Sequence, residues 1–434
     1  MDKMADVLGR AGAWCGQNKY LSAIKNAFQN FMPLTIAGAI GVLWCNVLVN
    51  DQTGLGLFFK PIMALDFLNP AFQAVNFCTI SCITVGITLG IAQEIGVWNM
   101  GAERAGYIPG LVGLAAWLSV TNTSHMVEGA KEAFTGIAGN ELGATGLFTG
   151  MIIGVLSVEL FCFFEKQDAL KIKMPEQVPP GVARAFEVLV PATITLIITA
   201  CIGSACYNLT GLYLNDVIKN GIQGPLGAVG ATIPGVMIIY LVIMLFWLVG
   251  IHGNNMLSAV KEALFTPLAL ENVEKFNKGE KPTNIINIYF LQMCGEFGGS
   301  GVTIGLVIAI MIFGKREDNK AIASLSLVPG LFNINETVTF GIPMVLNPIL
   351  GIPFVFACLV TILVGYVLTV IGFCPVACLT VPWTTPPIVF GFLATGANVM
   401  GAVTQAILIV VSTVIYVPFL IAYEKYQNKQ AAEA

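Results

Sequence analysis

Three ionisable side chains interrupt or end long apolar stretches of the sequence. Glu296 and Glu336 each lie in a stretch that otherwise lacks Asp, Glu, Lys and Arg, and His252 ends the run YLVIMLFWLVGIHGNN. A charged side chain at mid-membrane costs at least about 2.5 kcal/mol, so an isolated one is a candidate for function. Carboxylate and imidazole groups can also exchange protons with a ligand. Each residue has a plainer interpretation, as a loop carboxylate or a helix-end histidine at the membrane surface.

Amide side chains accompany these three residues along the chain. They suit hydroxyl-rich ligands because each amide both donates and accepts hydrogen bonds. A cation site would favour several carboxylates close together, and an anion site would favour arginine, which the deep segments lack. We therefore predict that Glu296 and four amides bind a sugar. The amides are Asn254, Gln292, Asn333 and Asn335.

A sugar site also benefits from an aromatic platform, because a sugar ring has an apolar face that stacks on indole. Trp383 lies in the segment VPWTTPP, which prolines break, and is the best placed tryptophan for this role. The alternative is that Trp383 belongs to the belt of aromatic residues at the membrane interface. The sequence leaves both interpretations open.

The composition decides the setting in which these residues act. The chain has 434 residues, 56% of them hydrophobic and 11% charged, whereas a soluble domain carries about 25% charged residues. The long unbroken apolar runs also disfavour a β-barrel, whose strands alternate apolar and polar residues. We predict an all-α polytopic membrane protein with about ten transmembrane helices and two re-entrant hairpins. A net charge of −4 excludes a broad basic surface for nucleic acid.

Cysteine spacing gives no sign of a metal site, since none of the 11 cysteines forms a CxxC pair. We expect no metal and no cofactor. Charge-free stretches locate the spans. They are 26–50, 71–93, 105–125, 144–164, 188–207, 232–251, 302–314, 349–372 and 399–423.

Basic residues orient these spans. Those before the first span place the N-terminus in the cytoplasm, and the charged segments 165–187 and 261–281 fall on the same side after four and six crossings. The C-terminal lysines also reach the cytoplasm if 324–348 is a re-entrant hairpin, which its prolines and glycines favour. Segment 373–396 is a second hairpin candidate. Interrupted segments of this kind mark binding sites in transporters.

The pattern of regular and broken segments predicts three parts. Residues 1–208 form an N-terminal transmembrane domain of regular spans. Residues 209–230 include a short amphipathic helix at the interface. Residues 231–434 form a C-terminal domain that contains the broken segments and all the candidate site residues.

Three segments resemble signatures of a known family. They are PEQVPPGVARAFEVLVP from Pro175, GIHGNN from Gly250 and NINETVTFGIPMVLNP from Asn333. They are similar to segments of enzyme IIC, the membrane subunit of bacterial phosphoenolpyruvate-dependent sugar phosphotransferase systems, in the lactose/cellobiose/diacetylchitobiose branch. The resemblance spans nearly the whole chain. One departure is Thr337, where many relatives have proline.

The resemblance implies a carrier of a β-linked disaccharide, such as cellobiose or diacetylchitobiose, in the bacterial plasma membrane. The sugar crosses within the carrier, and a phosphocysteine of a separate cytosolic enzyme IIB phosphorylates its 6-hydroxyl. Glu336 and His252 are the implied catalytic pair. The resemblance also implies a homodimer in lipid, in which the N-terminal half forms the interface and the C-terminal domain moves as a rigid body.

The residues alone leave an alternative function open. In an ion-coupled secondary sugar transporter, Glu296 and Glu336 would be the coupling carboxylates, because broken helices and lone carboxylates fit that mechanism equally well. The two functions differ in the product inside the cell, which is sugar phosphate for the phosphotransferase system and unmodified sugar for the rival. Classification as an enzyme stays open, since the phosphoryl donor would lie on another chain.

Overall fold

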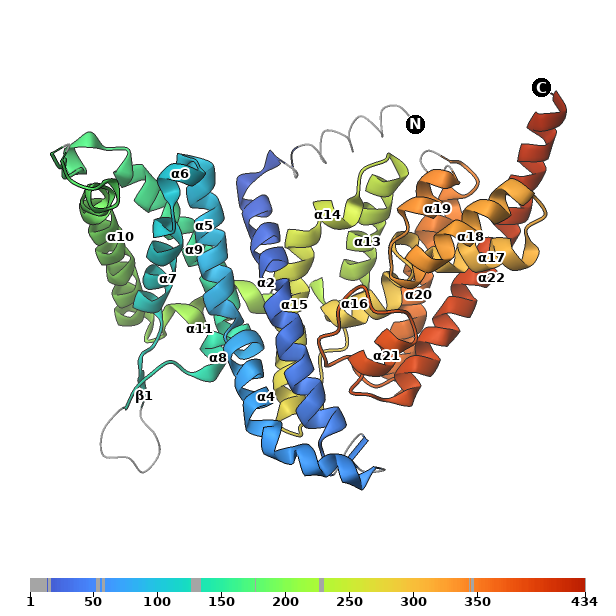
Figure 1. Cartoon of the computed structure of the whole chain (residues 1–434), viewed down its shortest axis with the longest axis horizontal. Helices are drawn as coiled ribbons and strands as arrows, with labels where there is room; N and C mark the ends of the chain where they lie inside the picture. Colours follow the sequence, from blue (N-terminus) through green and yellow to red (C-terminus); the bar gives the residue numbers. More distant parts are fainter. Residues whose placement is uncertain are drawn as a thin grey trace. The chain divides into compact units, whose positions relative to one another are not determined.

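The computed structural model describes residues 14, 17–51, 55–56, 59–125, 134–175, 177–225, 230–342, 344 and 347–433. Helices account for most of them (Figure 1). The described strands are β1 (Ser124–His125) and β2 (Phe134–Thr135), which pair antiparallel. The all-α class predicted from the sequence is confirmed.

The chain folds as two compact units. Unit 2 contains residues 17–38 and 75–227, and unit 1 contains 39–74 and 228–434. Residues 39–74, which the sequence analysis assigned to an N-terminal domain, therefore belong to the same unit as the C-terminal half. The predicted assignment of dimerisation and transport to different domains stays a prediction. The predicted domains include positions 1–13 and 226–229, which lie outside the described residues.

Unit 2 is a bundle in which α5, α7, α9 and α10 pack side by side (Figure 1). Small residues allow close packing, since a Cβ on Gly113 would lie 2.3 Å from that of Ala92. Helix α11 with the π-helical turn η5 covers 214–223, within the predicted amphipathic segment. The helices of this unit are the first part of α2 (Lys19–Leu43), η3 (Phe77–Ser81), α5 (Ile83–Met100), α6 (Ala102–Ala105), α7 (Ile108–Val120), α8 (Gly139–Leu142), α9 (Ala144–Glu165), η4 (Asp168–Leu170), α10 (Pro180–Thr210), α11 (Leu214–Ile218) and η5 (Lys219–Gln223).

Unit 1 carries the broken segments. In it, α22 packs against α17, α20 and α21, and α20 packs against α13 and α16. Its helices are η1 (Trp44–Leu48), η2 (Lys60–Leu68), α4 (Asn69–Asn76, which continues into unit 2), α13 (Ile233–Leu248), α14 (Gly253–Met256), α15 (Ser258–Asn277), α16 (Ile288–Gly295), η6 (Ser300–Val302), α17 (Ile304–Phe313), α18 (Glu317–Leu331), α19 (Glu336–Gly341), α20 (Gly351–Val370), α21 (Val389–Ala394) and α22 (Val399–Glu433).

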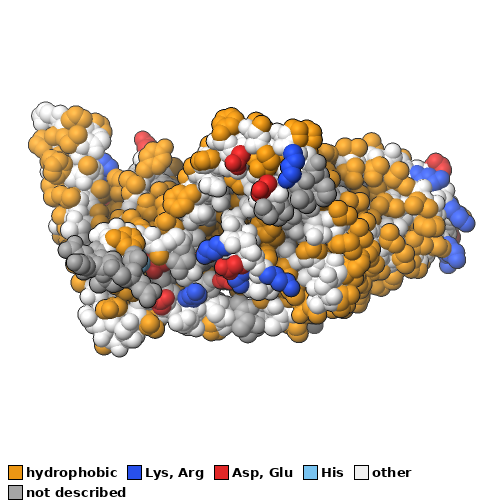
Figure 2. Space-filling view, turned by 90° about the horizontal axis from the view of Figure 1, so that it is seen from below, with side chains coloured by type: hydrophobic (Ala, Val, Ile, Leu, Met, Phe, Trp, Pro, Cys, Tyr) orange, Lys and Arg blue, Asp and Glu red, His pale blue; other side chains and the backbone are white. Residues whose placement is uncertain are grey.

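Many helices have the length and composition of membrane spans. Among the described residues, five helices are long and apolar enough to cross a membrane, or up to seven if each of two bent pairs is one span. Two shorter apolar helices, α7 and α13, add to these. Hydrophobic side chains cover much of the face in Figure 2, and charged side chains gather in a few groups. These features fit a polytopic membrane protein, and the predicted count of about ten crossings stays a prediction.

Two predicted spans differ from the structure. The span predicted over 105–125 contains a shorter helix, α7, and its last residues form strand β1. The span predicted over 302–314 is the second arm of a bent pair, in which α16 and η6 meet α17 at 59°. Three glycines with positive φ, Gly298, Gly299 and Gly301, lie at this bend between α16 and α17.

The two predicted hairpins have different structures. Segment 324–348 contains the end of α18, a turn at 332–335 and the short helix α19, which packs back on α18. Positions 343, 345 and 346 of this segment lie outside the described residues. Segment 373–396 is irregular up to Ile388 and then forms α21. The re-entrant placement of both stays a prediction.

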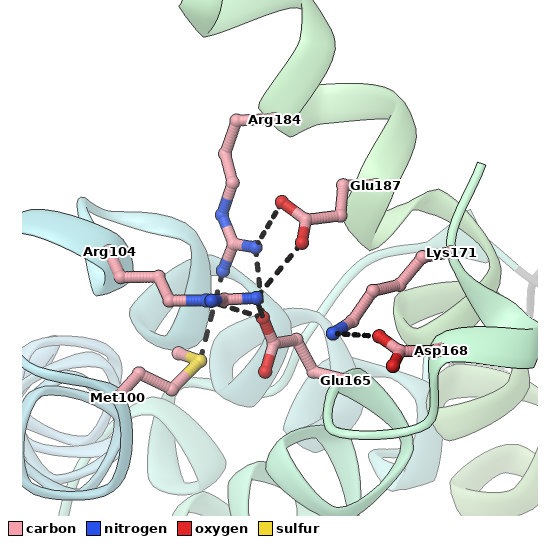
Figure 3. Close-up of polar contacts among 7 residues, drawn as sticks. All are labelled: Met100, Arg104, Glu165, Asp168, Lys171, Arg184 and Glu187. Atoms are coloured by element: carbon pink, nitrogen blue, oxygen red, sulfur yellow. Dashed lines mark hydrogen bonds and ion pairs between the residues drawn. The ribbon is translucent and has the colours of Figure 1, made fainter. Parts of the chain in front are cut away.

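A cluster of charges fixes the start of α10 in unit 2 (Figure 3). Glu165, at the buried end of α9, accepts hydrogen bonds from Arg104 and Arg184, each at 2.9 Å. Both arginines also contact Glu187. The two positive and two negative charges compensate one another, so α6, α9 and α10 are joined at one end without an unpaired buried charge.

Candidate functional site

His252 and Glu336 lie side by side in unit 1, although 84 positions separate them in the numbering. His252 is the N-cap of α14, and its Nδ1 accepts a hydrogen bond from the backbone N–H of Asn255 at 3.2 Å. In the neutral ring the proton is therefore on Nε2. Nε2 lies 3.8 Å from Oε1 of Glu336, which is too long for a direct hydrogen bond. A hydroxyl oxygen can lie about 2.8 Å from both atoms.

The surroundings of His252 favour its neutral form. Burial lowers the pKa of His252 below its ordinary value of 6.5, and the positive charge of Lys261 acts in the same direction. The carboxylates of Glu336 and Glu296 act against this shift without cancelling it. The imidazole is therefore neutral at pH 7, with one ring nitrogen able to donate to a ligand oxygen.

An aromatic residue that the sequence analysis missed supports His252. The ring of Trp247 lies against the imidazole, with centroids 4.4 Å apart and planes inclined by 47°. The side chain of Trp247 is buried, and its Nε1 has no hydrogen-bond partner among the described residues. Its position five residues before His252, at the end of the same apolar run, is a signal in the sequence.

The segment between α16 and α17, residues 296–302, forms a tight loop that we call the glycine loop. Gly299 has φ +88° and Gly301 has φ +74°, and Val302 also has a positive φ of 49°. Positive φ at a β-branched residue such as Val302 is a strained conformation of the kind that clusters at functional sites. A Cβ on Gly299 would lie 2.5 Å from the Cβ of Asn335. Glycine is therefore required for this close approach.

The predicted sugar-binding amides surround this loop. Asn254 donates to Oγ of Ser300 at 2.9 Å, and Asn335 donates to the carbonyl oxygen of Ser300 at 2.8 Å. Asn333 accepts from the backbone N–H of Gly298 at 2.6 Å. These three amides thus bind protein atoms, which limits what they offer to a ligand.

Asn333 also joins a third segment to the site. Its Nδ2 donates to the carbonyl oxygen of Trp383, and to that of Thr385 at 3.1 Å. Both of its N–H donors are therefore used. Trp383 remains about half exposed, with 44% of the surface of the residue accessible. The structure thus brings the backbone of Trp383 to the same region as Asn333 and leaves its side chain available.

Gln292 lies in α16 and is not part of this hydrogen-bond network. Its Oε1 is buried and has no partner among the described residues. A buried amide oxygen without a partner costs free energy unless a ligand or water binds it. Gln292 therefore keeps an acceptor available.

Glu296 is not an isolated carboxylate, contrary to the expectation from the sequence. Its Oε1 accepts from the hydroxyl of Tyr240 at 2.7 Å and forms an ion pair with Nζ of Lys261. Lys261, predicted to lie in a cytoplasmic loop, is a buried residue of α15. The error arose because charge alone assigned this segment to a loop.

The helical pattern of α15 contains the missing signal. Lys261 shares its buried stripe with Phe265, Ala269 and Asn272, at helical spacing. More exposed charges lie at the C-terminal end of the helix, where Glu274 pairs with Lys278 just after it. A helical periodicity over 258–277 therefore distinguishes the inward lysine from the outward ones.

Known proteins are similar in sequence to this chain over most of its length. Residues 25–358 match the family described as Phosphotransferase system, EIIC. The chain is 33% identical to the oligo-beta-mannoside-specific EIIC component of Bacillus subtilis (strain 168), over 98% of this chain and 94% of the relative. It is 30% identical to the cellobiose-specific EIIC component of Lactococcus lactis subsp. lactis (strain IL1403), over 98% of each.

A solved structure has the same fold over nearly the whole chain. The crystal structure of ChbC, the IIC component from the N,N'-diacetylchitobiose-specific phosphotransferase system, has a TM-score of 0.88 and 29% sequence identity, and the match covers 97% of each chain. This agrees with the resemblance of the three sequence segments. The chain belongs to the EIIC family and is the multi-pass membrane permease component of a sugar phosphotransferase system.

Proposed function

We propose that this permease binds a β-linked disaccharide such as cellobiose or diacetylchitobiose, moves it inward and presents its 6-hydroxyl to phospho-enzyme IIB. The observation that carries the proposal is the His252–Glu336 pair, in which a neutral donor nitrogen and a carboxylate oxygen are 3.8 Å apart. The names of the similar proteins support the substrate class, since they specify oligo-β-mannosides, cellobiose and diacetylchitobiose.

The chemistry needs an acceptor hydroxyl in line with the phosphorus and a base for its proton. In the proposed step, the 6-hydroxyl oxygen accepts from Nε2 of His252 and donates to Oε1 of Glu336. As its oxygen bonds to phosphorus, the S–P bond to the enzyme IIB cysteine breaks, and the thiolate leaves. Glu336 takes the hydroxyl proton. His252 orients the hydroxyl and carries no phosphoryl group, so a phosphorylated His252 peptide would contradict the step.

The remaining groups suit recognition of the sugar. Trp383 offers a half-exposed indole for the apolar face of a ring, and Gln292 offers an unpartnered oxygen for a hydroxyl. The contacts of four other residues hold the loops that surround the site. These residues are Asn254, Glu296, Asn333 and Asn335. Specificity among disaccharides then depends on how the sugar hydroxyls are oriented at Trp383 and Gln292.

The wider setting follows from the family and the sequence. We propose that the protein works as a homodimer in the bacterial plasma membrane, with both termini in the cytoplasm. Its C-terminal domain carries the sugar by rigid-body motion to the side where enzyme IIB binds. Lys315 is a candidate contact for enzyme IIB because its side chain is exposed beside α18, whereas Arg316 is already bound to Asp318 and Asn428.

The contacts of Glu296 disfavour the alternative of ion-coupled transport. A coupling carboxylate must exchange its proton or cation during transport, and Glu296 is already bound to a buried lysine and a tyrosine. Of the two carboxylates expected for coupling, only Glu336 is free of a strong ion pair.

Uptake by proteoliposomes tests the proposal. The purified protein is reconstituted with labelled cellobiose or diacetylchitobiose, and phosphoenolpyruvate and the soluble phosphotransferase components are enclosed. We expect labelled sugar phosphate inside, dependent on enzyme IIB and unaffected by proton or sodium ionophores. Accumulation of unmodified sugar that an ionophore abolishes would contradict the proposal. A thermal-shift screen of disaccharides with the purified protein identifies the sugar.

A further inference from the structure

We propose that Lys261 is a positioning residue for sugar phosphorylation, which sets the geometry of His252 and Glu336 through Glu296, Asn254 and the glycine loop. This inference rests on the proposed function. It assigns a role to a buried cation that neither contacts the reacting pair nor binds the sugar.

Lys261 is enclosed by partners from three elements. Its Nζ pairs with Oε1 of Glu296 in the glycine loop and lies 3.5 Å from Oδ1 of Asn254 in α14. The same nitrogen lies 5.6 Å from the ring centroid of Tyr240 in α13. These contacts come from α13, α14 and the glycine loop, and together they fix the position of the ammonium group.

Asn254 transmits this arrangement to the loop. Its Oδ1 faces Lys261, and its Nδ2 donates to Oγ of Ser300. The lysine thus determines which end of the amide points to the loop, because an ammonium group attracts the oxygen and not the NH2. A flipped Asn254 would turn its NH2 group toward the ammonium group of Lys261 and lose that contact.

Ser300 connects the segment that carries His252 with the segment that carries Glu336. Its hydroxyl binds Asn254, two residues after His252, and its carbonyl binds Asn335, immediately before Glu336. Ser300 is buried and lies between two glycines with positive φ. The position of Ser300 therefore controls the spacing of His252 and Glu336.

Charge balance gives Lys261 a second effect on the pair. The groups that act on His252 are Glu336 from α19, Lys261 from α15 and Glu296 from the glycine loop. Lys261 lowers the pKa of His252, so it helps to keep the imidazole neutral. A buried ion pair is weak evidence for stability alone, because desolvation offsets its attraction. The position of this ion pair beside the proposed reacting pair is better explained by orientation and charge.

The test compares Lys261→Met with the double variant Lys261→Met/Glu296→Gln. The double variant keeps the test valid if the single variant fails to fold, since it leaves no uncompensated buried carboxylate. Lys278→Met is the matched control, because Lys278 lies exposed just after the same helix and pairs with Glu274. Phosphorylation is measured with enzyme IIB present, and disaccharide binding is measured at equilibrium.

We expect the double variant to bind the disaccharide within threefold of wild type and to lose at least tenfold in kcat for phosphorylation. In Lys261→Met we expect the pH–rate midpoint to move upward, because His252 loses a positive charge that lowers its pKa. In the double variant this shift should be smaller, because the carboxylate of Glu296, which raises that pKa, is lost as well. Lys278→Met should match wild type in both assays.

Wild-type kcat in the folded double variant would overturn the inference while leaving the proposed function intact, and so would an unmoved pH–rate midpoint in folded Lys261→Met. Equal losses in binding and kcat would overturn it as well, since they indicate a purely structural role. If the wild-type protein forms no sugar phosphate in the same assay, the proposed function fails and this inference fails with it.

Discussion

The reacting pair shows how local backbone chemistry selects a side-chain state. The N–H of Asn255 at the start of α14 occupies Nδ1 of His252, so the second ring nitrogen must carry the proton that faces Glu336. Burial of the ring then favours the neutral form. The function assigned to His252 therefore depends on a helix cap as much as on the residue type.

Replacement of Glu336 by glutamine tests the proposed base. The change keeps the shape of the side chain and removes its ability to take a proton, so phosphorylation should fall by about 10²–10⁴-fold. Equilibrium binding of the disaccharide should persist. The amount of sugar phosphate formed with enzyme IIB is measured. Glu317→Gln is the control, because Glu317 is an exposed residue of α18. Full loss of binding would show that Glu336 is mainly a ligand contact.

The lowered pKa of His252 predicts a dependence of stability on pH. The folded protein binds this proton less readily than the unfolded chain, whose ordinary pKa is 6.5. His252 therefore contributes stability that is present above pH 6.5 and is lost as pH falls through the lower folded pKa. We expect the Tm of wild type to fall more between pH 7 and pH 5 than the Tm of His252→Gln. Parallel Tm curves for the two proteins would contradict this prediction.

At the scale of elements, irregular segments carry the site and regular helices hold them. The glycine loop interrupts the α16–α17 pair and contacts residues from four other elements through Glu296, Gly298 and Ser300. Its positive φ values exclude most side chains. The hydrogen bonds of the loop hold it in this restricted backbone conformation, which makes the loop rigid.

Substitution of Gly299 by alanine tests this close packing. The new Cβ would lie 2.5 Å from Asn335, so the turn before Glu336 must shift. Gly279→Ala is the control, since Gly279 also has positive φ and has nothing within 4 Å of the new atom. We expect Gly299→Ala to cost about 1–3 kcal/mol of stability beyond the control, because of the overlap with Asn335, and to reduce phosphorylation. Equal Tm values for both variants would contradict the close approach.

The charge cluster at the start of α10 makes a separate prediction for unit 2. Arg184→Met leaves Glu165, whose side chain is 3% exposed, with Arg104 as its remaining basic partner among the described residues. We expect a loss of about 2 kcal/mol, below the full cost of an uncompensated buried charge. Lys171→Met is the control because it breaks only the pair with exposed Asp168 (Figure 3). A Tm for Arg184→Met as high as that of the control would contradict the role of the cluster.

At the scale of the whole molecule, the low content of charged residues and the length of the helices indicate a membrane environment. Helix α22 has 35 residues and ends in a segment with Lys425 and Lys429, so its apolar part is long enough to cross a bilayer before the charges begin. Buried Glu424 accepts hydrogen bonds from the backbone N–H groups of Lys315 and Arg316. The C-terminal charges and the loop before α18 are therefore on the same side of unit 1.

The predicted orientation places that side in the cytoplasm, following the positive-inside tendency. A green fluorescent protein fused after residue 434 should fluoresce, and alkaline phosphatase fused there should be inactive. A fusion of each reporter after residue 315 should give the same result, because Glu424 binds that loop. Active alkaline phosphatase at either position would contradict the predicted topology.

The sequence alone determined the class of the protein, and with the family resemblance it indicated the proposed reacting pair. Low charge and long apolar runs require a membrane environment, and within it Glu336 and His252 are conspicuous because few other ionisable groups are present. The family signatures lie in short contiguous segments, so they are also readable from the sequence. None of these inferences depends on which way a side chain points.

Only the tertiary structure decided the partners. It pairs Glu296 with Lys261, 35 residues away, and directs Asn254 to Ser300, 46 residues away. Such contacts depend on the phase of each helix and on how the helices pack, and a bend at three glycines changes both. A charge count cannot distinguish a buried lysine from a loop lysine for the same reason. The fold thus arranges the candidate ligands as two pairs, His252–Glu336 and Lys261–Glu296, at the glycine loop.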